Sequence, residues 1–213
     1  MAVDFRDEAP AILKDYLIYK QTIKNMSKKT VDEYFIDLRT FFRFLKVMRG
    51  LVPDGTEFDE IKIDDVDLDL IKTVNLELAY DYMNFLYRDR NNKSASRARK
   101  CSSLKGFFKY ITNNKHLLDT NPVEQLESPK NKKALPKYLT LEQSIELLNA
   151  VDGNNKQRDY CILTLFLNCG LRVSEMAGLN YNDIHSDGTM RVVGKGNKER
   201  IVYLNSIIQI GRA

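Results

Sequence analysis

A short segment rich in proline and lysine limits what this sequence can fold into, because it divides the chain into two unequal parts. Pro122, Pro129 and Pro136 fall close together, with Lys130, Lys132, Lys133 and Lys137 nearby. Proline lacks an amide hydrogen and fixes φ, so a helix does not run through such a segment and the chain there is stiff. The chain of 213 residues is long enough for two small domains. We predict a first domain over residues 1–120, a linker over 121–137 and a second domain over 138–213.

The part before the linker has the pattern of a small bundle of amphipathic helices. Its apolar residues recur at spacings of three and four, which places them on one helix face. Ser27 has the side chain of a helix N-cap, and either Ser94 or Ser96 is expected to cap the fourth helix. The four helices are expected over residues 8–24, from 27 to about 45, over 76–88, and from 94 or 96 to about 112. The acidic segment 50–73 is expected to form a loop or a loosely packed extension.

The part after the linker mixes helices with one hairpin. Thr140 with Gln143 three residues later has the arrangement of a capping box. Residues 157–168 are strongly apolar, which predicts a buried helix, and residues 173–179 predict a short one. Two strands, 189–193 and 199–204, are expected around Gly194 to Lys198. The predicted fold class is mainly α: a four-helix N-terminal domain, then a partial mixed-α domain with a small β-hairpin.

Charge is distributed unevenly along the chain. The formal net charge is +4, yet residues 51–90 carry −7 and residues 91–137 carry +8. A basic region of this kind suits a polyanionic partner. A solvated helix face explains a charge run equally well, so charge alone leaves both interpretations open.

Other features of the composition exclude several classes of protein. No apolar run approaches the roughly 20 residues that a membrane-spanning helix needs, and residues 1–10 lack the pattern of a secretory signal. Cys101, Cys161 and Cys169 have no CxxC spacing. They predict buried free thiols in a reducing cytoplasm, with no metal site.

Gly170-Leu171-Arg172 is the first candidate for chemistry. Arg172 follows the glycine that ends an apolar helix, where a charge is costly unless it faces an anion or a carboxylate. Glu175 lies three residues later on the same helix face. An arginine–glutamate pair that staples the turn is the alternative to a catalytic role.

Lys195 is the second candidate, at the tip of the expected hairpin. Gly194 and Gly196 beside it permit positive φ and a close approach of the backbone to a ligand. An arginine fork and a flexible lysine, brought together, suit phosphodiester chemistry. Taken alone, this turn could equally be an exposed one with solubilising lysines.

Read together, these motifs resemble the start of the catalytic domain of tyrosine recombinases, the phage-integrase and Xer-type family. The matching string runs through Gly170 to Glu175, residues 180–184 and residues 192–204. The resemblance covers nearly the whole chain. Residues 27–45 and 96–110 resemble the family's SAM-like core-binding domain, and residues 121–136 match its interdomain connector.

The resemblance implies a function and a set of roles. In the family, the arginine matched by Arg172 stabilises a pentavalent phosphorane, and the lysine matched by Lys195 protonates the departing 5′-hydroxyl. The nearby acidic position matches Glu175. These roles imply DNA cleavage and rejoining through a 3′-phosphotyrosine, without metal or nucleotide cofactor. Double-stranded DNA is the implied partner, and the full-length form is expected to be tetrameric on DNA.

Basic side chains on two expected helices and the linker are the candidates for DNA contact. Lysine and arginine on a helix face neutralise phosphates, and some reach base edges in the major groove. The candidates are Lys28, Lys29, Arg39, Arg43, Arg97, Arg99, Lys100, Lys105 and Lys133.

Departures from the family pattern limit what this chain can be expected to do. The family also needs a His-x-x-Arg motif and a tyrosine nucleophile near the C-terminus. Neither His116 nor His185 heads such a motif, so both are expected to be structural. Tyr203, which alternates within a strand, is expected in the core. We therefore expect a monomeric fragment that binds DNA without cleaving it, with apolar surface left uncovered on the 157–168 helix.

Two other functional classes stay open at this point. The chain could be a non-catalytic DNA-binding protein or regulator derived from a recombinase. It could also be a helical protein–protein scaffold, in which case the basic helices are ordinary solvated surface. The sequence names neither the target DNA site nor the biological event.

Overall fold

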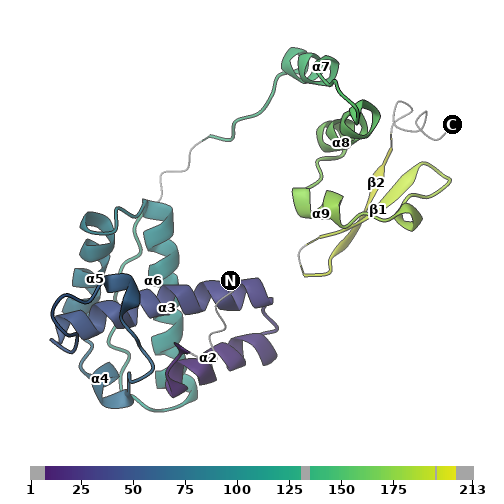
Figure 1. Cartoon of the computed structure of the whole chain (residues 1–213). Coiled ribbons are helices and arrows are strands. Elements are labelled where there is room, and N and C mark those ends of the chain that lie inside the picture. Colours follow the sequence, from purple (N-terminus) through teal and green to yellow (C-terminus); the bar gives the residue numbers. More distant parts are fainter. Residues whose placement is uncertain (1–7, 131–134, 195, 205–213) are drawn as a thin grey trace. The chain divides into compact units, whose positions relative to one another are not determined.

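The chain forms two compact units in the computed structural model, which describes residues 8–130, 135–194 and 196–204. The units comprise residues 1–133 and 134–213. In the described residues the first unit is helical, whereas the second combines helices with a two-stranded antiparallel sheet (Figure 1). The mainly helical fold class is therefore confirmed. The domain limits 1–120, 121–137 and 138–213 stay a prediction.

The first unit is built on four longer helices joined by short elements. As predicted, Ser27 caps the second of them, since its side chain accepts a hydrogen bond from the backbone N–H of Thr30 at 3.3 Å. Asn75 caps the third in the same way through Leu78. The elements are α2 (Ala11–Thr22), α3 (Lys28–Met48), η1 (Phe58–Glu60), α4 (Leu68–Lys72), α5 (Leu76–Arg88), α6 (Ser94–Lys109) and the π-helical turn η2 (Tyr110–Asn114).

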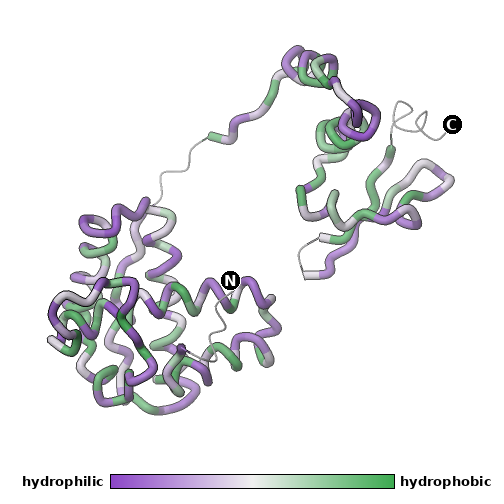
Figure 2. Tube along the Cα trace, in the orientation of Figure 1, coloured by the Kyte–Doolittle hydropathy of each residue, from purple (hydrophilic) through white to green (hydrophobic). Residues whose placement is uncertain are grey.

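Aromatic rings make up much of the core of this unit. Phe41 packs edge-on against Tyr82, with ring centroids 5.1 Å apart, and Phe107 packs edge-on against Tyr16 at 5.5 Å. All four rings are buried. Edge-to-face pairs add stabilisation beyond the area they bury. They fix α2, α3, α5 and α6 against one another, and hydrophobic stretches alternate with hydrophilic ones along these helices (Figure 2).

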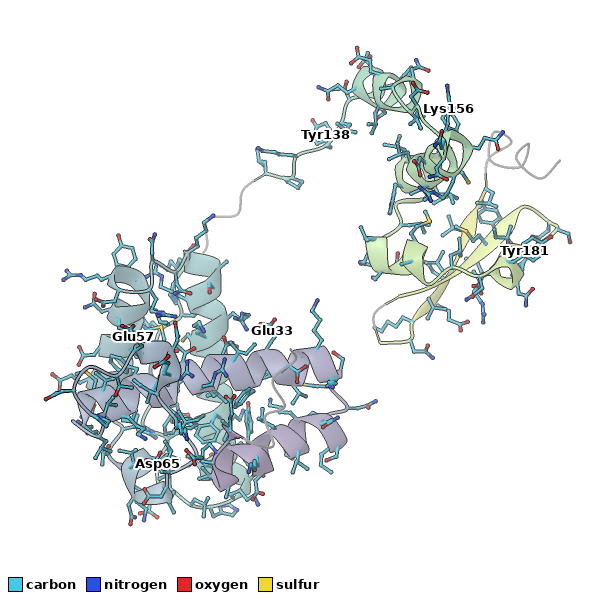
Figure 3. All side chains as sticks on the ribbon, in the orientation of Figure 1. Glu33, Glu57, Asp65, Tyr138, Lys156 and Tyr181 are labelled. Carbon is cyan, nitrogen blue, oxygen red and sulfur yellow. The ribbon has the colours of Figure 1, made fainter. Side chains whose placement is uncertain are left out.

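The acidic segment 50–73 is mostly loop, as one of the two expectations had it, with only η1 and α4 as short helices in it. It packs on the first unit, so the alternative expectation of a loosely packed extension is wrong. Ile61 and Ile63 are buried. The Lys46 ammonium lies 2.7 Å from the carboxylate of Asp65, which is labelled in Figure 3, and Arg43 Nε donates to the Ile61 carbonyl at 2.9 Å. Alternation of acidic and apolar residues permits this, because the apolar ones turn inward while acidic groups and carbonyls meet basic side chains of α3.

The start of α6 differs from expectation, whereas its end agrees, because η2 continues the helix to Asn114 where about Thr112 was expected. Lys93 occupies the N-cap position, so neither Ser94 nor Ser96 caps the helix. Ser96 instead donates to the side-chain carbonyl of Asn92 at 2.9 Å. Beyond the helix, Val123 and Leu126 are buried in the core of the first unit. The beginning of the proline-rich segment therefore packs as part of this unit.

The second unit contains α7 (Leu141–Asn149), α8 (Lys156–Cys169), α9 (Val173–Ala177), η3 (Tyr181–Asp183), β1 (Thr189–Val193) and β2 (Glu199–Tyr203). The predicted capping box is present: Thr140 Oγ1 accepts from the Gln143 N–H at 3.3 Å, and Gln143 Oε1 accepts from the Thr140 N–H at 3.0 Å. The strands pair with Met190 opposite Val202. A small core of Leu165, Leu171, Met190 and Val192 joins α8 to the hairpin.

The helix predicted over 157–168 is present as α8, but the prediction that it is buried is wrong for most of its residues. In α8 only Thr164 and Leu165 are buried, while Tyr160 is 39% exposed and Leu167 38%. The core of the second unit covers one side of α8, so the other side keeps apolar surface in contact with solvent. That uncovered surface was itself expected, and its tendency to drive association stays a prediction.

Three further expectations concern membranes, metals and thiols. Over the described ranges, no helix is both long and apolar enough to cross a bilayer. Nor do three or more His, Cys, Asp or Glu side chains converge in that part of the chain as a metal site would require. Cys101 is buried, but Cys161 is exposed, so the expectation of uniformly buried thiols is wrong.

Candidate functional site

The turn between α8 and α9 determines where Arg172 lies. Gly170 ends α8 in the left-handed region at φ +59°, a conformation that favours glycine, and its N–H donates to the Phe166 carbonyl at 3.1 Å. Leu171 then points into the small core at 7% exposure. Arg172 follows in extended conformation as the N-cap residue of α9. The buried leucine thus anchors the chain, and the arginine side chain projects outward.

Glu175 is the centre of the site. Its Oε1 accepts from Arg172 Nη1 at 2.7 Å and from Arg200 Nη1 at 2.8 Å. Its Oε2 accepts from the Arg172 backbone N–H and from Arg200 Nη2, both at 2.8 Å. A carboxylate has about four lone-pair positions for acceptance, so these four bonds saturate it. The pairing of Arg172 with Glu175 was considered from the sequence, whereas Arg200 was missed.

The three side chains differ sharply in exposure. The Glu175 side chain is 2% exposed, that of Arg200 38% and that of Arg172 70%. A buried carboxylate is costly unless it is paired. Here hydrogen bonds from Arg200, and then the Arg172 N–H, hold the pKa of the Glu175 carboxyl well below its usual range, against the opposing effect of burial. Glu175 is therefore ionised at neutral pH.

The base of the β1–β2 hairpin lies against this carboxylate. A Cβ atom placed on Gly194 would lie 3.1 Å from Glu175 Oε1, so a side chain there would press on the site. The Gly194 N–H donates to the Lys198 carbonyl at 2.7 Å and closes the hairpin loop. Lys195, the predicted catalytic lysine, lies outside the described residues. Gly194, the residue before it, lies beside the Glu175 carboxylate.

A second ion pair supports the same hairpin away from Glu175. Arg191 on β1 donates to Asp183 Oδ1 through Nε at 3.0 Å and Nη2 at 2.8 Å. Asp183 Oδ2 accepts from the Asn180 backbone N–H at 2.9 Å. That bond and those from Arg191 lower the pKa of the Asp183 carboxyl. This pair fixes the turn before β1 and is distinct from the arginine–glutamate cluster.

Several predicted DNA-contacting side chains of the first unit are engaged inside it. Lys100 was expected on an exposed face, but its side chain is 9% exposed and its ammonium lies 3.1 Å from Asp37 Oδ1. Arg99 lies 2.8 Å from Asp37 and from Glu33, which is labelled in Figure 3. The pattern of basic residues on α6 could not reveal a buried acid on α3.

Other predicted residues of this set lie partly or fully in solvent. Lys28 and Lys29 are exposed in the first turn of α3. Arg97 is half-buried, with its guanidinium 4.8 Å from the ring centre of Tyr87. Lys105 is half-buried too and donates to the Leu126 carbonyl at 2.9 Å.

Two arginines of α3 face acidic partners. Arg39 pairs with Glu8 at 2.8 Å, and Arg43 lies 3.4 Å from Asp59.

Lys133, the predicted DNA contact in the linker, lies outside the described residues. Lys109, which the sequence reasoning did not select, is exposed at the end of α6. Its spacing of four from Lys105 was the available signal.

The remaining candidates are the histidines and the last tyrosine. Tyr203 is 81% exposed on the outer face of β2, so its expected place in the core is wrong. Its strand is short and the core lies on one side only. His185 Nδ1 lies 3.1 Å from Thr189 Oγ1 in the turn before β1, and His116 is exposed with φ +53° after η2.

Comparisons with known proteins give consistent results for both units. Residues 13–115 match the model of the phage integrase N-terminal SAM-like domain, and residues 137–210 match that of the phage integrase family. Tyrosine recombinase XerC of Caldanaerobacter subterraneus subsp. tengcongensis is 50% identical over 196 residues, which are 92% of this chain and 55% of that protein. The chain thus spans about half the length of this curated relative.

Solved structures share the fold at low sequence identity. The XerH site-specific recombinase bound to a palindromic difH substrate is 18% identical with a TM-score of 0.63, over 92% of this chain and 53% of that one. A lambda integrase fragment, as a dimer bound to a COC′ core site, is 17% identical with a TM-score of 0.60, over 90% and 62%.

Proposed function

We propose that this chain, which belongs to the phage integrase family of tyrosine recombinases, binds duplex DNA and carries part of a site for DNA cleavage and rejoining. The whole protein would act as a site-specific recombinase through a 3′-phosphotyrosine. The observation that supports this most directly is an exposed arginine, Arg172, tethered to a buried carboxylate beside a glycine-flanked hairpin.

The proposed roles follow from the chemistry of each group. Arg172 would bind the scissile phosphate and stabilise the charge that develops on it. Glu175 would orient Arg172, to which it is bound through both the backbone and the side chain. Lys195 would protonate the leaving 5′-hydroxyl, as its match to the family lysine implies.

We propose that the exposed basic residues of the first unit contact the DNA backbone. Lys28 and Lys29 are the strongest candidates, since both lie in solvent at the start of α3. Arg97 and Lys105 are half-buried, which leaves part of each side chain exposed. Lys133 stays in the proposed set with them. Arg39, Arg43, Arg99 and Lys100 would act chiefly by holding the unit together, because each meets an acidic partner.

The assembly and the setting are proposed on the same basis. The 213-residue chain would be monomeric in the absence of DNA, and the whole protein would act as a tetramer on DNA. The cytoplasm is the proposed location. Equilibrium sedimentation of the chain, alone and with duplex DNA, would measure its oligomeric state. A stable dimer in the absence of DNA would contradict the proposed monomer.

DNA binding can be measured by fluorescence anisotropy over a range of salt concentrations. Each phosphate contact contributes about 0.9 to the slope of log affinity against log salt. Lys28→Ala with Lys29→Ala should therefore reduce the slope by about 1.8. Lys62→Ala, an exposed lysine in the acidic segment, is the matched control and should leave it unchanged. Salt-independent or undetectable binding by the unaltered chain would contradict the proposal.

Cleavage should be absent from this chain on its own. Tyr203 lies in β2 of the short hairpin, outside the sequence context of the family nucleophile, so nicked suicide substrates should give no covalent product. The assay is an SDS-resistant protein–DNA band on a denaturing gel. Such a band, lost on Tyr203→Phe, would overturn this part of the proposal and make Tyr203 the nucleophile.

A further inference from the structure

Arg200 is part of the arginine–glutamate cluster, although it stands on β2 and lies 25 residues from Glu175 in sequence. Its two terminal nitrogens donate to the two oxygens of the carboxylate at 2.8 Å each. Such a fork-to-fork pair is geometrically specific. Arg172 has a looser hold on the same group, through one side-chain nitrogen and its backbone N–H.

The arginine–glutamate cluster has one positive charge that no acidic group in it compensates. Two guanidinium groups and one carboxylate give a net charge of +1. Arg200 and Glu175 form the more buried and better aligned pair, whereas the Arg172 side chain is 70% exposed. The uncompensated charge is therefore displayed at Arg172, on the solvent side of the cluster.

We propose that Arg200 is a positioning residue: it neutralises Glu175 and fixes its carboxylate, which leaves the charge of Arg172 free for a DNA phosphate. This inference rests on the proposed function and adds to it a role for Arg200, which lies within the matching string 192–204 but to which the resemblance assigned no role. Without Arg200, the carboxylate would form a neutral pair with Arg172. The site would then lose its net charge while Arg172 itself remained in place.

Arg191 provides a matched control on the same hairpin. It makes a comparable two-nitrogen contact with a buried carboxylate, that of Asp183. In the part of the chain that the structure describes, the carboxylates within reach of Arg191 are those of Asp183 and, at 3.4 Å, Glu199, not that of Glu175. Its side chain is 46% exposed, close to the 38% of Arg200. Substituting either Arg191 or Arg200 should therefore lower the stability of the hairpin, but only the substitution of Arg200 should remove the uncompensated charge at Arg172.

The experiment measures the salt slope of duplex binding for the 213-residue chain and five variants. Arg200→Gln should lower the slope by about 0.9, the value of one phosphate contact. Arg172→Ala should lower it equally, and the double variant Arg172→Ala/Arg200→Gln should lower it no further, because both remove the same contact. Arg191→Gln should keep the unaltered slope.

The fifth variant separates charge from structure. Arg200→Gln combined with Glu175→Gln removes both members of the fork, so Arg172 regains an uncompensated charge and the slope should return to within about 0.3 of the unaltered value, a third of one contact. Removing both partners of a buried pair is also better tolerated than removing one, so this variant keeps the test valid if Arg200→Gln fails to fold. Circular dichroism monitors folding throughout.

The outcomes distinguish the inference from the function on which it rests. If the unaltered chain shows no salt-dependent DNA binding, the proposed function fails. If it binds but the Arg172 and Arg200 effects add, or Arg191→Gln matches Arg200→Gln, or Glu175→Gln gives no rescue, Arg200 has no positioning role and only the inference falls.

Discussion

Replacing Asp37 with alanine should destabilise the first unit more than any substitution of its basic partners. The Asp37 side chain is 1% exposed and lies on α3. It accepts from Ser103 Oγ at 2.7 Å, from Arg99 Nη1 at 2.8 Å and from Lys100 Nζ at 3.1 Å, all on α6. Asp37→Ala would leave the Lys100 ammonium, only 9% exposed, with Thr40 Oγ1 at 3.4 Å.

The expected cost is about 4 kcal/mol. Breaking a buried ion pair by removing one partner costs roughly 3–5 kcal/mol, because the other charge stays buried without compensation. The Arg99 contact adds less than about 1 kcal/mol, since that side chain is 44% exposed and can find water instead. Removing both charges with Asp37→Asn/Lys100→Met should cost under about 2 kcal/mol, because no unpaired ion remains.

The loss of stability is measured by urea denaturation, monitored through the near-ultraviolet circular dichroism of tyrosine. Tyr16 and Tyr82 are fully buried in the first unit, whereas in the second Tyr160 is 39% exposed and Tyr138, Tyr181 and Tyr203 are more than four-fifths exposed. The signal therefore reports chiefly the first unit. Glu8→Ala, which breaks the more exposed Arg39 pair, is the control and should cost under about 1 kcal/mol. An Asp37→Ala cost equal to that of Glu8→Ala would refute the reasoning.

Two further predictions concern a glycine in the first unit and the carboxylate in the second. Gly106→Ala would place a Cβ 2.8 Å from the buried Tyr16 hydroxyl, so it should cost about 1–3 kcal/mol of stability in urea denaturation despite the better helix propensity of alanine. In a Tyr16→Phe background, which lacks that hydroxyl, the same substitution should stabilise the protein. A cost that is the same in both backgrounds would exclude the clash. Because the folded pKa of Glu175 is depressed, its stabilising contribution should be complete above the unfolded pKa of about 4.3 and decline as pH falls toward the folded value. Acid titration of the second unit by circular dichroism should therefore show a Glu175→Gln difference that is constant from about pH 8 to 5 and shrinks below; a difference that grows in acid would contradict this.

Local patterns predicted much of the secondary structure because they act over a few residues. Ser27 and the Thr140–Gln143 box cap helices as expected, since capping needs only a side chain within three residues. The hairpin around Gly194 also follows from strand alternation and turn residues. The prediction failed at Ser94 and Ser96 because a serine can also bond to a neighbouring side chain, as Ser96 does to Asn92.

By itself, the sequence determined the helical class, the hairpin and the Arg172–Glu175 spacing, because each depends on neighbours along the chain. Only the tertiary structure decided which charges are free. Asp37 takes Lys100 out of solvent from 63 residues away, and Arg200 on β2 reaches Glu175 on α9 from 25 residues away. Electrostatic pairing depends on distance in space and on burial, neither of which a linear pattern of charged residues contains. The tertiary structure therefore separates the basic residues that hold this fold together from those that remain available to an anion.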